Sequence, residues 1–150
     1  MPIIPQPIPF NIGSTNGSGN GGDTGMFYIS GNIDGASNNA DMFFGLFYSG
    51  TWANSTTEGD VDSTLNTGFT IIRHQAMLFS NTKNGATILS FRDDGASSDS
   101  LTVGAGTSGE FNSGAISVAV ADDSKCCWNR DASASSSGTN YYTEFITGEK

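Results

Sequence analysis

The stretch that decides the fold is TILSFRDDGASSDSLTV, residues 87–103. An apolar run at 88–91 and a second at 101–103 flank a polar segment that contains glycine. Short apolar runs on either side of an Asp-Gly pair predict two antiparallel strands joined by a hairpin, with the turn beginning at 93–95. Because side chains alternate along a strand, four apolar residues are expected to share one face of this hairpin: Leu89, Phe91, Leu101 and Val103.

The composition extends this prediction to the whole chain. The 150 residues include 20 glycines and 10 phenylalanines, and only 14% of the residues are charged. Short aromatic and β-branched runs separated by Ser, Thr, Asn and Gly are typical of an all-β domain. The predicted fold is an antiparallel double-sheet sandwich, specifically an eight-stranded jelly roll. Its candidate strands are 26–30, 42–48, 69–73, 75–79 (or 69–79 as one strand), 87–92, 100–103, 115–121 and 125–130, with a further run at 140–147.

The first 25 residues differ from the rest. All four prolines lie among the first nine residues and alternate with apolar side chains, which predicts an extended arm outside any sheet interior. Residues 13–25 are rich in Gly, Ser and Asn and predict a flexible tether. The sequence therefore divides into an arm and tether at 1–25 and a jelly roll at 26–150. Apolar arm residues are expected to dock on a partner, and these are Ile3, Ile4, Ile8, Phe10 and Ile12.

The charge balance narrows the possible partners. The formal net charge is −9, with six scattered Lys and Arg residues, whereas a nucleic-acid site needs clustered basic residues. The longest apolar stretch, 42–48, is much shorter than the ~20 residues that span a bilayer. The N-terminal residues lack the pattern of a secretory signal peptide, so synthesis in a cytoplasm is expected.

Two kinds of motif suggest a cofactor or a metal but lack the necessary context. The segments 17–22 and 104–109 match G-x-G-x-x-G, yet neither opens a helix that could hold a pyrophosphate. A loop with regularly spaced polar residues resembles the start of a calcium loop, but Leu65 and Ile71 replace its required Gly and Glu. We therefore predict no cofactor and no metal at this loop, whose polar residues are Asp60, Asp62, Thr64 and Asn66.

The sequence indicates no enzyme. His74 is the only histidine, and no nucleophile motif accompanies it, so a structural role is predicted. Cys126 and Cys127 are adjacent, and in a strand they point to opposite faces. One buried and one outward-facing thiol are expected, with a disulfide between two chains as the alternative.

The segment 42–48 is apolar on both of its faces. A strand of this kind is covered twice, once by the core of its own domain and once by something else. A second subunit is a natural second cover. The sequence therefore predicts a contact between subunits that includes the strand 42–48, with Phe43 and Phe47 in it. The number of subunits, a homotrimer, is what the resemblance given next implies.

Residues 88–121, ILSFRDDGASSDSLTVGAGTSGEFNSGAISVAVA, resemble a pattern in phage virion proteins with jelly-roll domains. These domains are similar in shape to trimeric tumour-necrosis-factor-like domains. The pattern is a strand that ends in Arg, a Gly-containing turn, LTV, a Gly/Thr-rich loop with G-x-F, and V-x-V-A. The chain departs from it at Asp122-Asp123, where Gly-Asp is usual, which leaves the turn into 125–130 open.

The resemblance implies a structural or adhesive role on a viral capsid or tail, commonly as a trimer. The leading hypothesis is a capsid decoration (cement) protein or head fibre on the exterior of a bacteriophage, whose arm binds the major capsid protein. One alternative is a receptor- or glycan-binding tail-fibre tip, with Tyr48 and Trp52 as sugar platforms. Another is a secreted carbohydrate-binding module.

Overall fold

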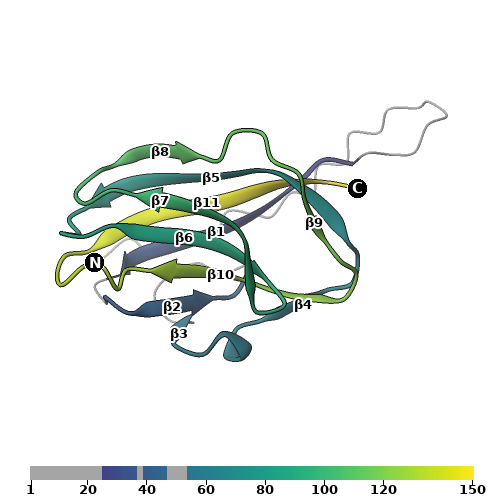
Figure 1. Ribbon diagram of the computed structural model, residues 1–150, viewed down its shortest axis with the longest axis horizontal. Helices are drawn as coiled ribbons and strands as arrows, with labels where there is room; N and C mark the ends of the chain where they lie inside the picture. The colour runs from purple at the N-terminus through teal and green to yellow at the C-terminus, as the bar shows by residue number, and fades with distance from the viewer. Residues whose placement is uncertain (1–24, 37–38, 47–53) are drawn as a thin grey trace, which may run out of the picture.

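In the computed structural model, two antiparallel β-sheets pack face to face as a sandwich (Figure 1). The structure describes residues 25–36, 39–46 and 54–150. The predicted all-β sandwich is confirmed. The described elements are β1 (Phe27–Ala36), β2 (Asp41–Phe44), β3 (Asn54–Ser55), the 3-10 helix η1 (Glu58–Asp60), β4 (Ser63–Leu65), β5 (Phe69–Asn81), β6 (Thr87–Asp93), β7 (Ala96–Val103), β8 (Gly109–Asn112), β9 (Val118–Val120), β10 (Ser124–Asp131) and β11 (Asn140–Glu149).

We name the two layers by their central strands. The β5 sheet has the order β1-β11-β5-β8, and β9 also pairs with β5. The β10 sheet has the order β3-β2-β10-β6-β7, and β4 also pairs with β10. Strands far apart in the sequence are thus neighbours in space, as β1 and β11 are in one sheet and β2 and β10 in the other. This order is consistent with the predicted jelly roll.

The hairpin that opened the sequence analysis is present as β6 and β7. Its strands pair so that Leu89 lies opposite Leu101. Asp94 and Gly95 form the turn with φ values of 47° and 83°, a conformation that suits Gly and is tolerated by Asp. The four side chains expected on one face, Leu89, Phe91, Leu101 and Val103, are all buried.

Several other strands differ from the predicted ones in their boundaries. Residues 69–81 form one continuous strand, because β5 is the pairing partner of β11, β8 and β9. The strand predicted at 115–121 shortens to β9, and β7 begins at Ala96 rather than at residue 100. The short strands at 54–65 and 109–112 were not predicted, since their Ser, Thr, Asn and Gly residues show no apolar alternation.

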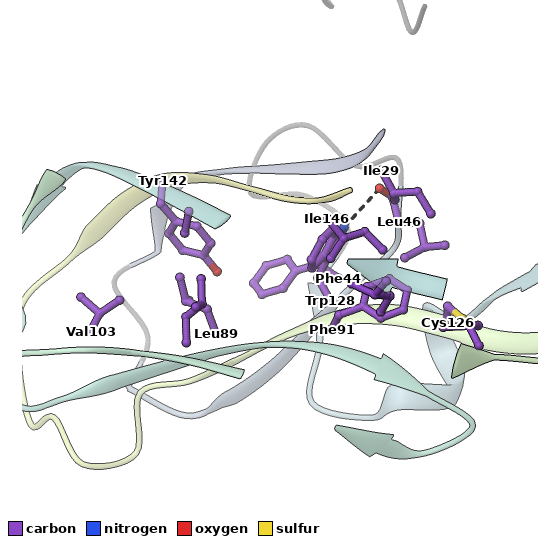
Figure 2. Packing of buried hydrophobic residues seen from close by; sticks show 14 of the residues in the cluster. Ile29, Phe44, Leu46, Leu89, Phe91, Val103, Cys126, Trp128, Tyr142 and Ile146 are labelled. Carbon is purple, nitrogen blue, oxygen red and sulfur yellow. Dashed lines mark hydrogen bonds between the residues drawn. The ribbon is translucent and has the colours of Figure 1, made fainter. Parts of the chain in front are cut away.

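Trp128 on β10 lies at the centre of the core between the sheets. Its ring packs edge-on against Phe91 with centroids 5.2 Å apart, and its Nε1 donates a hydrogen bond to the Leu46 carbonyl at 3.3 Å (Figure 2). A Cβ atom at Gly31 would lie 2.9 Å from the indole. The absence of a side chain at Gly31 therefore lets β1 approach the largest core residue.

Cys126 and Cys127 both lie in β10, and both are free and buried. The prediction of an outward-facing thiol is wrong, because η1 covers the outer side of β10 at this point. The Cys127 thiol donates to Glu58 Oε1 at 3.7 Å. Burial raises the pKa of the Cys126 thiol to about 12 and also raises the pKa of Cys127. A disulfide between chains would need one of these sulfur atoms at the surface.

Candidate functional site

The most distinctive group of side chains is an ionic cluster around His74, buried between the sheets. His74 on β5 is 0% exposed, and each of its ring nitrogens lies beside a carboxylate. Nδ1 is 2.8 Å from Asp99 Oδ2 on β7, in the opposite sheet. Nε2 is 2.8 Å from Glu144 Oε1 on β11, the neighbouring strand. The imidazole therefore connects the two sheets through a chain of three side chains.

The surroundings of His74 determine its charge. Burial alone lowers the pKa of His74, but hydrogen bonds and charge interactions with Asp99 and Glu144 outweigh this effect and raise it to about 9. Burial also raises the pKa of Glu144, and its contact with His74 opposes that change. At neutral pH His74 is thus an imidazolium held between two carboxyl groups. Such a buried arrangement is stable only when its members satisfy one another.

The geometry of this cluster suits structural stabilisation. Both ring nitrogens of His74 are engaged, so neither is free to act as a general base. The nearby Ser113 hydroxyl accepts a hydrogen bond from the His74 backbone N–H at 3.0 Å and donates to the Gly114 carbonyl at 3.0 Å. Sequence reasoning identified His74 but missed Asp99 and Glu144. A signal for Glu144 existed, because it alternates with Tyr142 and Ile146 and so falls on the core face.

A second polar group lies in the same core layer. The Arg130 side chain on β10 is buried and donates from Nη1 to Asn140 Oδ1 at 3.2 Å. Lys83 is also buried, and its Nζ donates to Asn39 Oδ1 at 2.7 Å. Burial lowers the pKa of both cations. The Tyr142 hydroxyl, also buried, has no hydrogen-bond partner among the residues that the structure describes.

A third cluster joins η1 to the β10 sheet. Ligand-type atoms of Glu58, Asp62 and Cys127 lie within 4.8 Å of one another. Arg92 already provides the cation, because its Nε is 2.7 Å from Glu58 Oε1 and its Nη2 donates to Glu58 Oε2 at 2.9 Å. The raised pKa of Cys127 keeps the thiol protonated, and a thiol binds metals as the thiolate. We assign no metal to this cluster, and of the loop positions considered from the sequence only Asp62 belongs to it.

Phe43 on β2 is already covered by residues of its own chain. It is 8% exposed, and Met42 and Phe44 beside it are also buried. The Arg92 guanidinium carbon lies 5.4 Å from the centroid of the Phe43 ring, a distance at which a cation is attracted to an aromatic face. Double coverage of this strand was predicted, but for Phe43 part of the second cover is Arg92. The trimer contact at Phe43 stays a prediction.

Large apolar side chains are exposed on the outer face of the β5 sheet instead. We call this surface the aromatic face and define it by Tyr28 on β1, Tyr141 on β11, and Met77 and Phe79 on β5. Their exposed fractions are 57%, 39%, 37% and 68%, respectively. Strand pairing places Met77, Phe79 and Tyr141 near one another, because Thr143 lies opposite Met77 and Tyr141 lies opposite Ser80. Tyr28 lies further along the same side of the sheet, opposite Thr147. Sequence reasoning placed 75–79 in a strand but did not foresee that its outer side chains would be exposed.

Several predicted contact residues lie outside the described residues 25–36, 39–46 and 54–150. They are the arm residues Ile3, Ile4, Ile8, Phe10 and Ile12, the second trimer residue Phe47, and the sugar-platform candidates Tyr48 and Trp52.

Comparison of the chain with protein families, with curated proteins and with solved structures finds no match in any of the three. Over residues 25–36, 39–46 and 54–150, no helix has the length and apolar character needed to cross a membrane.

Proposed function

We propose that the protein is a non-enzymatic structural protein of a bacteriophage particle. In this proposal it is a capsid decoration (cement) protein or head fibre that is made in the host cytoplasm and binds the capsid exterior. It acts as a homotrimer, and its N-terminal arm attaches it to the major capsid protein. The jelly roll is the rigid part, and residues 1–12 are the anchor.

One observation supports this proposal most. In the described part of the chain, buried His74 contacts two carboxyl groups and the buried cations Lys83 and Arg130 donate to asparagines, whereas apolar side chains extend outward on the aromatic face. His74 is bonded on both ring nitrogens, while Phe79 is 68% exposed. This distribution suits a module whose task is to remain folded and to bind other proteins. The resemblance to phage virion proteins, over β6 to β9, supports the same class.

The anchoring role follows from the chemistry of the arm. Burying each large apolar side chain contributes ~1.5–3 kcal/mol, and ordering each residue costs ~1–2 kcal/mol. Counted over the five apolar residues alone, burial contributes about 8–15 kcal/mol and ordering costs about 5–10 kcal/mol, so one arm supplies modest affinity at best. Three arms on one trimer bind together with a much higher effective affinity.

The test is deletion of residues 1–12. We expect the thermal transition of the truncated protein to stay close to that of the full chain, and attachment to purified capsids to be lost. A matched variant of full length, Ile3→Ser with Ile8→Ser, should weaken attachment in the same direction. If the truncated protein decorates capsids at wild-type occupancy, the arm is not the anchor.

A receptor- or glycan-binding tail-fibre tip is the second candidate, and the exposure of Tyr28, Phe79 and Tyr141 favours it, because sugar rings stack on aromatic side chains. A secreted carbohydrate-binding module would use the same chemistry. Association with phage heads supports decoration, association with tails supports the fibre tip, and glycan binding without either supports the secreted module.

A further inference from the structure

We propose that the aromatic face, on the outer side of β1, β11 and β5, is the surface that contacts a second copy of this chain. This inference rests on the homotrimer in the proposed function and names the surface that forms it. It moves the contact away from β2, where Phe43 is already covered within its own chain.

The first argument is the exposed apolar area. An aromatic side chain has on the order of 200 Å² to bury, so the neighbouring Phe79 and Tyr141 expose about 200 Å² before Met77 is added. With Met77 this area approaches the largest apolar patch on a typical monomer, about 300–600 Å², and Tyr28 exposes a separate ring further along the same side of the sheet. Together these side chains supply a substantial share of the ~800 Å² that each partner buries in a specific interface.

The second argument is that the charges around this face complement one another. The chain has a formal net charge of −9, so most of its surfaces repel a second copy. Among the side chains that the structure describes, the outer side of the β5 sheet carries an exposed residue of each sign near the apolar side chains. Arg73 lies four positions before Met77 on β5, and Glu110 on β8 lies directly opposite Met77.

These two charges indicate that the partner on the aromatic face is another copy of this chain. None of the ion pairs in the described part of the chain includes Arg73. In a symmetric assembly a residue of one copy meets a different residue of the next, and the same contact recurs at every interface. Arg73 of one copy can therefore pair with Glu110 of its neighbour around the oligomer, which an uncharged glycan or a partner of one charge sign would not use.

The first test measures the oligomeric state of the full-length protein by sedimentation at micromolar concentration. We expect a trimer for the wild type and a predominantly monomeric, folded protein for Phe79→Lys combined with Tyr141→Lys. Ile88→Lys is the matched control, because Ile88 is as exposed as Tyr141 but lies on the β10 sheet. That variant should remain a trimer.

The second test reverses the charges. Arg73→Glu and Glu110→Arg should each weaken self-association about tenfold or more, and the double variant should recover most of the loss. Recovery requires that the two residues meet across copies, so an effect confined to folding would not produce it.

Other outcomes would overturn the inference. A monomeric wild type excludes both the face and the homotrimer. A chain that associates only after residues 1–12 are deleted shows that the arm, not a second copy, occupies the face. If the Phe79→Lys and Tyr141→Lys protein stays trimeric while Phe43→Ser becomes monomeric, this face is wrong and the homotrimer of the proposed function stands.

Discussion

Each side of the β5 sheet carries some side chains that its surroundings would not favour, although most of the core-facing side is apolar. The side that faces the core holds an imidazole and a carboxyl group, His74 and Glu144, which are 0% and 1% exposed. The side that faces outward holds Tyr28 and Phe79, which are more than half exposed. Along β5, alternation of side chains places buried and exposed residues next to each other, as at Leu78 and Phe79.

This contrast shows that a polar side chain can be buried and an apolar one exposed, each for a different reason. A charged group can remain in the core when its partners satisfy it, and such pairs fix which strands face each other. An exposed aromatic group does not stabilise its own domain by burial, so we look for its function in contacts with other molecules. We therefore assign the inner face of the β5 sheet to stabilising the fold and the outer face to binding a partner.

The largest expected effect comes from breaking the ionic cluster on the inner face. His74→Leu leaves Asp99 and Glu144 without their shared partner, and removal of one member of a buried ion pair costs ~3–5 kcal/mol. Urea unfolding should show this loss as a lower midpoint. Replacing the buried pair together, as His74→Leu with Glu144→Met, should recover most of it. If the single variant is as stable as the wild type, the cluster does not hold the sheets together.

The pH dependence should show the next largest effect. The folded-state pKa of His74 is raised from 6.5 to about 9, so its contribution is fully present below about pH 6.5 and is lost as the pH rises through about 9. The raised pKa of Glu144 acts in the same direction. The pKa difference for His74 corresponds to about 3 kcal/mol.

Urea midpoints measured between pH 6 and pH 10 test this expectation. The variant with His74→Leu and Glu144→Met is the control, because other groups titrate in this range in both proteins. The wild type should lose more stability than the control as the pH rises. Parallel curves for the two proteins would show that His74 is not protonated in the folded state.

The smallest expected effect on folding is on the outer face. Phe79→Ala should change the free energy of unfolding by less than about 0.5 kcal/mol, because surface substitutions rarely do more. The adjacent residue is a matched contrast, since Leu78 is 2% exposed and Leu→Ala in a core costs ~2–5 kcal/mol. The comparison needs protein dilute enough to be monomeric. Equal losses at 78 and 79 would contradict the division between the two faces.

Local patterns predicted much of the fold. The β6–β7 hairpin was predictable because Asp94-Gly95 specifies its turn and the flanking residues alternate. The sandwich followed from short β-branched and aromatic runs between turn residues. The 54–65 segment could not be found in this way, because its elements are two or three residues long and rely on pairing with β2 and β10. Burial of Cys127 depends on that segment and was missed for the same reason.

The candidate site was less predictable than the fold. His74 was recognisable as a lone histidine in a strand, but its partners are 25 and 70 residues away in the sequence. Whether these partners reach His74 depends on how β7 and β11 lie against β5. The periodicity within one strand does not predict how strands are arranged relative to one another. The exposure of Phe79 was equally hidden, because alternation tells which side chains share a face but not which face meets the other sheet.

The pairing of β1 with β11 has a consequence for engineering the molecule. Phe27 lies opposite Gly148, so residue 25 and residue 150 emerge at the same end of the same sheet. A reporter fused after Lys150 would lie beside Gly25, where the tether joins the domain. The same proximity allows a circular permutant, in which a short linker joins Lys150 to Gly25 and new ends open at the exposed Asp94-Gly95 turn.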